Sequence, residues 1–240
     1  SRYFTTSRRG AELIKYASNA FLATKISYIN ELANLCEKAD VNIKDISTGM
    51  GLDQRIGERF LRAGPAYGGS CFPKDTKALV ETSKQFKTDL SIVKSAILSN
   101  YKRKTLLTKK LEKILNGKLK DKNITFLGVT FKPNTDDMRE ASSIPMINYL
   151  NKMKSKVKYY DPSGEKSDFR KLRYVKYSKD ISSACLHADL IVLHTEWNDF
   201  KLLNFKKLVK KKKFVIFDLR NIYSPEKMKK LKIKYFSIGR

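Results

Sequence analysis

The sequence predicts an α/β protein in which a helical region precedes an open parallel sheet. Two observations support this. From Ala11 to Lys38 the chain has no glycine or proline, and apolar residues recur at helical spacing. From Asn123 onwards, short apolar runs alternate with helical stretches, as in parallel sheets covered on both faces. We therefore expect two domains, 11–117 and 118–240, after a polar segment at 1–10 that looks like the end of a linker.

Four helices are expected in the first half. The segment 11–38 is apolar over much of its circumference, so it should pack against more than one partner. A short helix at 40–53 would turn Ile43 and Ile46 inward and end at Gly49 and Gly51. Residues 74–86 and 90–115 complete the helical region.

Five apolar runs are expected as strands: Ile124–Val129, Val157–Tyr160, Leu190–His194, Phe214–Asp218 and, more weakly, Tyr235–Ile238. Ligands of open parallel sheets bind beyond the carboxyl ends of the strands. The segments that follow these ends are Phe131-Lys132-Pro133, Asp161-Pro162, Thr195-Glu196-Trp197 and Arg220-Asn221. The sequence thus predicts one edge of a binding site.

The chain is strongly basic, with 50 Lys and Arg against 24 Asp and Glu. Such an excess suits a nucleic-acid surface or an acidic small molecule. The lysines are dispersed, and the one dense run, Lys206–Lys213, lacks interleaved aromatic residues. We therefore favour a solvated basic face, and keep a nucleic-acid-binding protein as the alternative function.

Three well-separated cysteines, Cys36, Cys71 and Cys185, indicate neither a disulfide framework nor a zinc site. No segment approaches the length of an apolar membrane span, and the first residues lack a signal-peptide core. These features lead us to expect a cytoplasmic protein with no membrane partner and no bound metal.

The segment Gly68–Asp75 combines a flexible turn with a thiol. Its two glycines permit a sharp turn and close approach to a ligand, and Pro73 allows a helix to begin. In such a helix Asp75 would lie one turn after Cys71, and a thiol at a helix N-terminus is favoured as thiolate. The alternative is a structural turn leading to a small buried cysteine.

Two further segments carry candidate polar groups. Lys15 and Asn19 lie four residues apart on the predicted long helix, where the lysine either reaches solvent or serves a site. The loop from Arg55 to Tyr67 is rich in glycine, arginine and aromatic residues. It could offer backbone N–H groups and guanidinium groups to phosphates, or be a structural loop.

Five short motifs occur in one order along the chain. They are Ala11-Glu12-Leu13 with Lys15 and Asn19, then Asn30-Glu31, Arg55-Ile56-Gly57, Gly68–Asp75, and Phe131–Asp137 with Arg139-Glu140. In this order the chain, from about Ala11 onwards, resembles the UDP-glucose 6-dehydrogenase family, whose C-terminal domain is Rossmann-like. Related GDP-mannose and UDP-N-acetylhexosamine dehydrogenases remain alternatives, although Cys-Phe-Pro-Lys-Asp-Thr is most similar to the UDP-glucose enzymes.

One departure concerns the cofactor. Family members begin with a dinucleotide-binding domain carrying a Gly-x-Gly-x-x-Gly turn, and no such turn follows any expected strand here. The resemblance implies a chain that lacks most of the NAD-binding part and is inactive by itself. A catalytic glutamate that relatives carry in that part cannot be assigned.

The resemblance implies a four-electron oxidation of UDP-glucose to UDP-glucuronate, a polysaccharide precursor, with two NAD molecules used in turn. Cys71 would be the nucleophile that carries a thiohemiacetal and then a thioester. Lys15 and Asn19 would stabilise the oxyanions, and Asp75 would orient or deprotonate the hydrolytic water.

The same resemblance implies how the ligands are held. Phe60, Leu61, Tyr67 and Gly68 belong to the loop around the nucleotide-sugar, Lys132 and Arg220 are cationic contacts to it, and Arg55 reaches the site of a partner subunit. Arg139 and Lys74 would lie on the cofactor side. The helix 11–38 would form the core of a homodimer.

Overall fold

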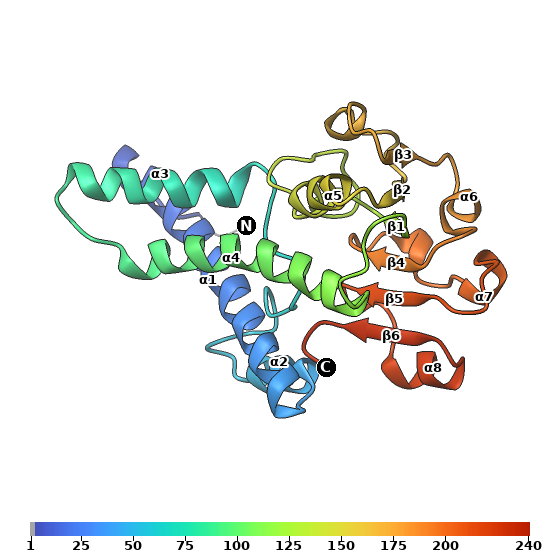
Figure 1. Ribbon diagram of the computed structural model, residues 1–240. Coiled ribbons are helices and arrows are strands. Elements are labelled where there is room, and N and C mark those ends of the chain that lie inside the picture. The colour runs from blue at the N-terminus through green and yellow to red at the C-terminus, as the bar shows by residue number, and fades with distance from the viewer. Residues whose placement is uncertain (1–2) are drawn as a thin grey trace.

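The computed structural model describes residues 3–240 and confirms the predicted fold class: a helical region followed by an all-parallel sheet (Figure 1). The helical region contains α1 (Arg8–Ala39), α2 (Ile43–Leu52), α3 (Cys71–Gln85) and α4 (Ser91–Ile114). Within residues 3–240, no helix is long and apolar enough to cross a membrane.

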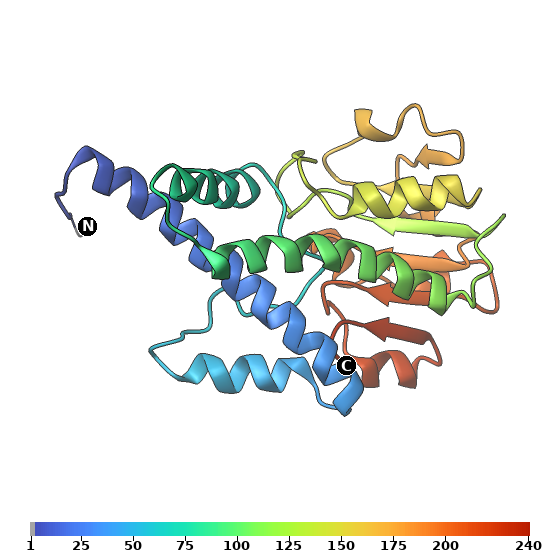
Figure 2. The same ribbon diagram turned by 60° about the vertical axis from the view of Figure 1, so that its left-hand side comes forward.

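Helix α1 is the central element of the helical region. Ser7 caps it by accepting a hydrogen bond from the Gly10 amide, so the helix begins three residues before Ala11, inside the segment expected as a linker. It packs against α2, α3 and α4, and Figure 2 shows it running diagonally across α4. Small buried residues such as Ala20, Ala23 and Ala33 permit this close packing on several sides.

Helix α3 begins one turn earlier than expected, at Cys71 rather than Lys74. Pro73 falls in the first turn, where its missing N–H costs nothing because the first amides of a helix have no partner within the helix. The thiol therefore belongs to the first residue of the helix.

The sheet contains β1 (Asn123–Leu127), β2 (Lys156–Tyr160), β3 (Val175–Tyr177), β4 (Leu190–Leu193), β5 (Val215–Asp218) and β6 (Lys234–Ser237). Its order is β3-β2-β1-β4-β5-β6, and every neighbouring pair is parallel. Strand β3 was missing from the sequence prediction because a three-residue edge strand carries little periodicity. The five predicted strands are present, with ends shifted by one or two residues.

The strand order reverses between β1 and β4, because the chain builds outward from β1 through β2 and β3 and then returns to β4. Open parallel sheets bind ligands at such a switch point, beyond the carboxyl ends of the strands. There the helical region meets the sheet (Figure 1).

Short helices and turns cover the sheet: α5 (Ser143–Lys152), α6 (Ile181–Cys185), α7 (Phe205–Leu208), α8 (Pro225–Lys230) and two 3₁₀ turns, Ser167–Phe169 and Asn198–Phe200. One apolar core joins α1 and α4 to the sheet through Ile29, Leu107 and Phe126. A second core, around Ile191 and Phe205, fills the other face. The helical region is thus continuous with one face of the sheet.

Candidate functional site

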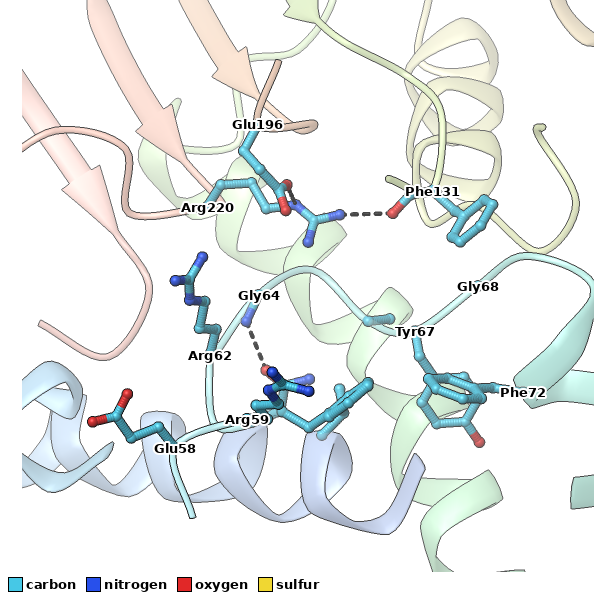
Figure 3. A pocket seen from close by; sticks show the side chains of 14 residues that line it. Glu58, Arg59, Arg62, Gly64, Tyr67, Gly68, Phe72, Phe131, Glu196 and Arg220 are labelled. Atoms are coloured by element: carbon cyan, nitrogen blue, oxygen red, sulfur yellow. Dashed lines mark hydrogen bonds and ion pairs between the residues drawn. The ribbon is translucent and has the colours of Figure 1, made fainter. Parts of the chain in front are cut away.

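A cavity of about 480 Å³ lies between the helical region and the carboxyl ends of the strands (Figure 3). Aromatic and charged side chains from both parts of the chain line it. The lining residues are Ile26, Asn30, Glu58, Arg59, Phe60, Arg62, Gly64, Ala66, Tyr67, Gly68, Phe72, Phe131, Glu196 and Arg220. Three arginines against two glutamates make it suitable for an anionic ligand with an apolar part.

The two glycines before Cys71 bring this loop against the sheet. A Cβ on Gly68 would lie 2.8 Å from the Glu140 carbonyl oxygen. Gly69 has φ +79°, and a Cβ there would lie 2.6 Å from the Phe131 ring. The Gly69 amide also donates to the Arg139 carbonyl at 2.7 Å. Both positions therefore require glycine. The sequence predicted close approach to a ligand at this turn, whereas the groups that exclude a side chain here are Phe131 and the Glu140 backbone.

Cys71 is an exposed thiol, unlike the buried Cys36 and Cys185. The structural alternative of a small buried cysteine is therefore wrong for Cys71. The residue opens α3 next to Ser70, whose hydroxyl lies 3.7 Å from Sγ. The following residue, Phe72, lines the cavity, whereas Cys71 is not among the lining residues. Burial raises the pKa of the Cys185 thiol to about 12, which leaves that cysteine inert near neutral pH.

Asp75 is buried and joins α3 to α1. Asn19 Nδ2 donates to Asp75 Oδ2 at 2.6 Å, and the ammonium groups of Lys74 and Lys15 lie 3.5 and 3.9 Å from the carboxylate. Oδ1 is buried without a hydrogen bond from residues 3–240. Asp75 thus brings Lys15 and Asn19 together with α3, and it retains an oxygen able to accept from a water. It faces α1, and no direct hydrogen bond links it to Cys71.

Arg220 lies at the opposite wall of the cavity, just after β5. Its backbone amide donates to Asp218 Oδ1 at 2.9 Å, which shapes the turn that presents the side chain. Burial raises the pKa of Asp218, and the carboxylate also accepts from the Tyr223 amide and the Tyr235 hydroxyl. The turn after β5 is therefore anchored from several directions.

His194, the buried residue directly after β4, contacts the same wall of the cavity through Arg220. Its Nε2 lies 2.8 Å from the Ser142 hydroxyl, and its carbonyl accepts from Arg220 Nε at 2.8 Å. Burial first, and the Arg220 charge second, lower the pKa of His194 well below its ordinary value. The imidazole is consequently neutral at physiological pH and acts as a structural polar group.

The structure places the predicted site residues in three settings. Phe60, Tyr67, Gly68 and Arg220 line the cavity. Cys71, Lys15, Asn19, Asp75 and Lys74 form the neighbouring thiol and carboxylate region. Four others lie outside the lining: Arg55, Leu61, Lys132 and Arg139.

Those four differ in their surroundings. Leu61 is buried in the apolar core, so only its backbone could reach a ligand. Arg55 is exposed and paired with Asp53 at 2.6 Å. Arg139 is exposed and paired with Asp137 at 2.8 Å, and this pairing, with a smaller contribution from Cys71, raises the pKa of the guanidinium. Lys132 is exposed, 5.4 Å from the centre of the Phe131 ring, and within residues 3–240 it forms no ion pair.

Glu58, Arg59 and Arg62 also line the cavity. The sequence singled out none of them by itself, although Arg62 lies in the segment 60–67 that the resemblance assigns to the nucleotide-sugar loop. Their signal was present, because they belong to the loop rich in glycine, arginine and aromatic residues. Nothing in the spacing showed which of its side chains turn inward. Within residues 3–240, no three His, Cys, Asp or Glu side chains cluster as metal ligands.

Family models match both parts of the chain. The central domain of the UDP-glucose/GDP-mannose dehydrogenase family matches residues 9–102, and the UDP binding domain of the same family matches residues 125–225. Together the matched ranges contain the thiol region and most of the sheet.

Individual relatives of the same family align with nearly the whole chain. A UDP-glucose 6-dehydrogenase of Rickettsia typhi is 46% identical over 241 residues, covering 99% of this chain and 56% of that protein. One from Rhizobium meliloti is 44% identical over 236 residues, covering 98% of this chain and 54% of that protein. This chain spans about half the length of the curated relatives it matches.

A solved structure has the same architecture. The UDP-glucose dehydrogenase of Pyrobaculum islandicum superposes with a TM-score of 0.84 at 31% identity, over 96% of this chain and 51% of that one. The thiol region and the arginine-lined cavity of this chain thus belong to an architecture shared with a nucleotide-sugar dehydrogenase.

Proposed function

Because this chain belongs to the UDP-glucose/GDP-mannose dehydrogenase family, we propose that it is the catalytic and nucleotide-sugar-binding part of a UDP-glucose 6-dehydrogenase. The observation that carries the proposal is the exposed thiol of Cys71 at the start of α3. It lies one turn before Asp75, which pairs with Asn19, and next in sequence to Phe72, which lines the arginine-rich cavity. We assign residues 11–117 to catalysis and dimerisation and residues 118–240 to the UDP-sugar.

Cys71 carries the sugar between the two oxidations. After the first hydride loss from C6, the thiolate adds to the aldehyde and forms a thiohemiacetal. Loss of a second hydride from C6 leaves a thioester, and water cleaves it to the carboxylate and the free thiol. Two NAD molecules, bound one after the other, would each supply the acceptor for one hydride.

The cluster around Asp75 supports these steps. The Lys15 ammonium and the Asn19 amide can donate to the oxygen on C6 when it becomes an oxyanion. Asp75 is held by Asn19 and has one oxygen without a hydrogen bond from residues 3–240, so it can accept from the hydrolytic water. Lys74 and Arg139 are exposed cations near Cys71, suited to the cofactor side.

The nucleotide-sugar occupies the cavity in this proposal. Phe60, Tyr67 and Gly68 contact it from the helical side, and Arg220 contacts the diphosphate from the sheet side. The backbone of Leu61 lies in the same loop. Lys132 lies outside the cavity lining, on the loop after β1; its ammonium group is exposed and forms no ion pair within residues 3–240, so it would be free to turn towards a bound nucleotide-sugar.

Binding of UDP-glucose to this chain tests the proposal directly. Calorimetric titration should show saturable binding, and Lys132→Ala should weaken it about tenfold, because a charge-assisted contact contributes on the order of 1.5 to 3 kcal/mol. Lys229→Ala, an exposed lysine of α8 outside the cavity, is the matched control and should change the affinity less than twofold.

Unchanged affinity in Lys132→Ala would remove that lysine from the site. Absence of any UDP-glucose binding would contradict the proposed function. A nucleic-acid binder would instead prefer DNA or RNA, with steep salt dependence. The relatives do not favour that alternative, because they are dehydrogenases.

The exposed face of α1 supports a homodimer. Ile14, Phe21, Tyr28 and Leu35 recur every seven residues and are 47 to 67% exposed. This spacing places them along one face of the helix, beside the surfaces used by α3 and α4. Apolar stripes of this kind usually mark an interface. In the dimer, the exposed Arg55 would exchange its pairing with Asp53 for contacts in the partner's site.

Phe21→Glu is expected to dissociate this dimer, because it places a charge at the centre of the stripe. Sedimentation velocity at micromolar concentration should show a dimer for the unmodified chain and a monomer for the variant. Leu202→Glu replaces an apolar side chain that is 90% exposed elsewhere, and it should leave the dimer intact. If the unmodified chain is folded and sediments as a monomer, the proposed dimer interface on α1 is wrong.

The free thiols of Cys36, Cys71 and Cys185 are compatible with a reducing compartment, and we place the enzyme in the cytoplasm. There it would supply UDP-glucuronate for polysaccharide synthesis. No dinucleotide fingerprint occurs in these 240 residues, so we expect the chain by itself to form no NADH.

A further inference from the structure

The Arg220 guanidinium is held by the protein on two of its three nitrogens. Nε donates to the His194 carbonyl at 2.8 Å. Nη2 donates to the Phe131 carbonyl, also at 2.8 Å (Figure 3). Nη1 forms no hydrogen bond within residues 3–240 and lies next to Gly64, where a built Cβ would be 3.5 Å from it. The two carbonyls therefore fix the plane of the guanidinium and leave one nitrogen for a ligand.

Glu196 places a carboxylate against the same group. Its Oε2 lies 2.8 Å from Arg220 Nε, but that N–H already donates to His194. Oε2 is buried and has no hydrogen bond from residues 3–240. Leaving a buried carboxylate oxygen without a hydrogen bond costs free energy of folding. Because two carbonyls already orient Arg220, the contribution of Glu196 is its charge.

That charge has a function when the cavity is empty. The Arg220 side chain is only 16% exposed, and burial lowers the pKa of its guanidinium, an effect that Glu196 and Asp218 oppose. A buried cation without a counter-charge would destabilise the fold. Glu196 supplies the counter-charge from the wall of the cavity itself, where an anionic ligand must bind.

We propose that Glu196 is a resident electrostatic competitor of the ligand: it neutralises Arg220 in the empty site and lowers the affinity of the cavity for a phosphate-bearing ligand. Only the identity of that ligand, a nucleoside diphosphate sugar, rests on the proposed function. The carboxylate also favours release of the product, which bears one more negative charge than the substrate.

Glu196→Gln keeps the shape of the side chain and removes the charge. Calorimetric titration of UDP-glucose, and separately of inorganic pyrophosphate, into the whole chain should show binding at least about fivefold tighter than without the substitution. The ligand-free variant should melt at a lower temperature, and UDP-glucose should raise its Tm more than it raises that of the unmodified chain.

Two control variants test whether the gain in affinity comes from the Glu196 charge acting on Arg220. Glu226→Gln removes an exposed carboxylate on α8, outside the cavity lining, so affinity should change less than twofold. In an Arg220→Gln background, Glu196→Gln should no longer improve binding of either probe, because the competition acts through Arg220. Glu196→Ala should reproduce the gain if the glutamine variant folds poorly.

Weaker or unchanged binding in Glu196→Gln overturns the proposal, since it would make Glu196 a positioning group or a bystander. A gain that persists without Arg220 also overturns it. If UDP-glucose fails to bind while pyrophosphate binding still responds to Glu196→Gln, the proposed function fails and the competitor role stands. If neither probe binds either form, both fail.

Discussion

Cys71→Ser is expected to reduce steady UDP-glucuronate formation on the order of a thousandfold or more, because the other two cysteines, Cys36 and Cys185, are buried and cannot carry the sugar in its place. The measurement requires an enzyme in which the dinucleotide-binding domain of a relative precedes this chain. Serine can form a hemiacetal and an ester, but an alkoxide is a poorer leaving group than a thiolate. NADH should therefore appear as a burst of at most two equivalents per site and then stop.

Ser70→Ala is the matched control for this experiment. Its hydroxyl lies 3.7 Å from the thiol and makes no capping hydrogen bond to α3, so turnover should stay within a few-fold of the unmodified enzyme. Mass spectrometry of the Cys71→Ser protein after the burst should detect a covalent sugar adduct. Near-normal uronate formation would exclude Cys71 as the nucleophile.

Lys15→Ala is expected to lower kcat about a hundredfold or more in the same enzyme while KM changes only a few-fold. The Lys15 ammonium lies 3.9 Å from Asp75 and is largely exposed, so it is not locked into this ion pair and can turn to an oxyanion at C6. Interactions that form mainly in the transition state lower kcat when removed, and leave ground-state binding almost intact.

Lys38→Ala removes an exposed lysine from the last turn of the same helix and should leave both constants unchanged. A change confined to KM in Lys15→Ala would make Lys15 a substrate-binding residue. A fall in Tm large enough to account for lost activity would instead assign it to the stability of the α1–α3 contact.

The sequence was most informative where structure depends on neighbouring residues. The absence of glycine and proline from 11 to 38 predicted α1, and the alternation of apolar runs with helices predicted five of the six parallel strands. The glycines at 68 and 69 predicted a sharp turn that approaches a ligand; the structure shows that they make room for the Phe131 ring and the Glu140 carbonyl of the protein itself. The short β3 strand and the true start of α3 were missed, because propensity defines element ends poorly.

The sequence by itself determined the fold class, the order of the motifs and the position of a thiol after a glycine turn, since each depends on local spacing. Only the tertiary structure decided that Asn19 holds Asp75 across 56 residues of chain, that Lys132 stays outside the cavity lining, and that Glu196 faces Arg220. These relations follow from how α1 crosses α3 and from the order of strands at the switch point. Residues far apart in the chain meet there through packing, which no periodicity encodes.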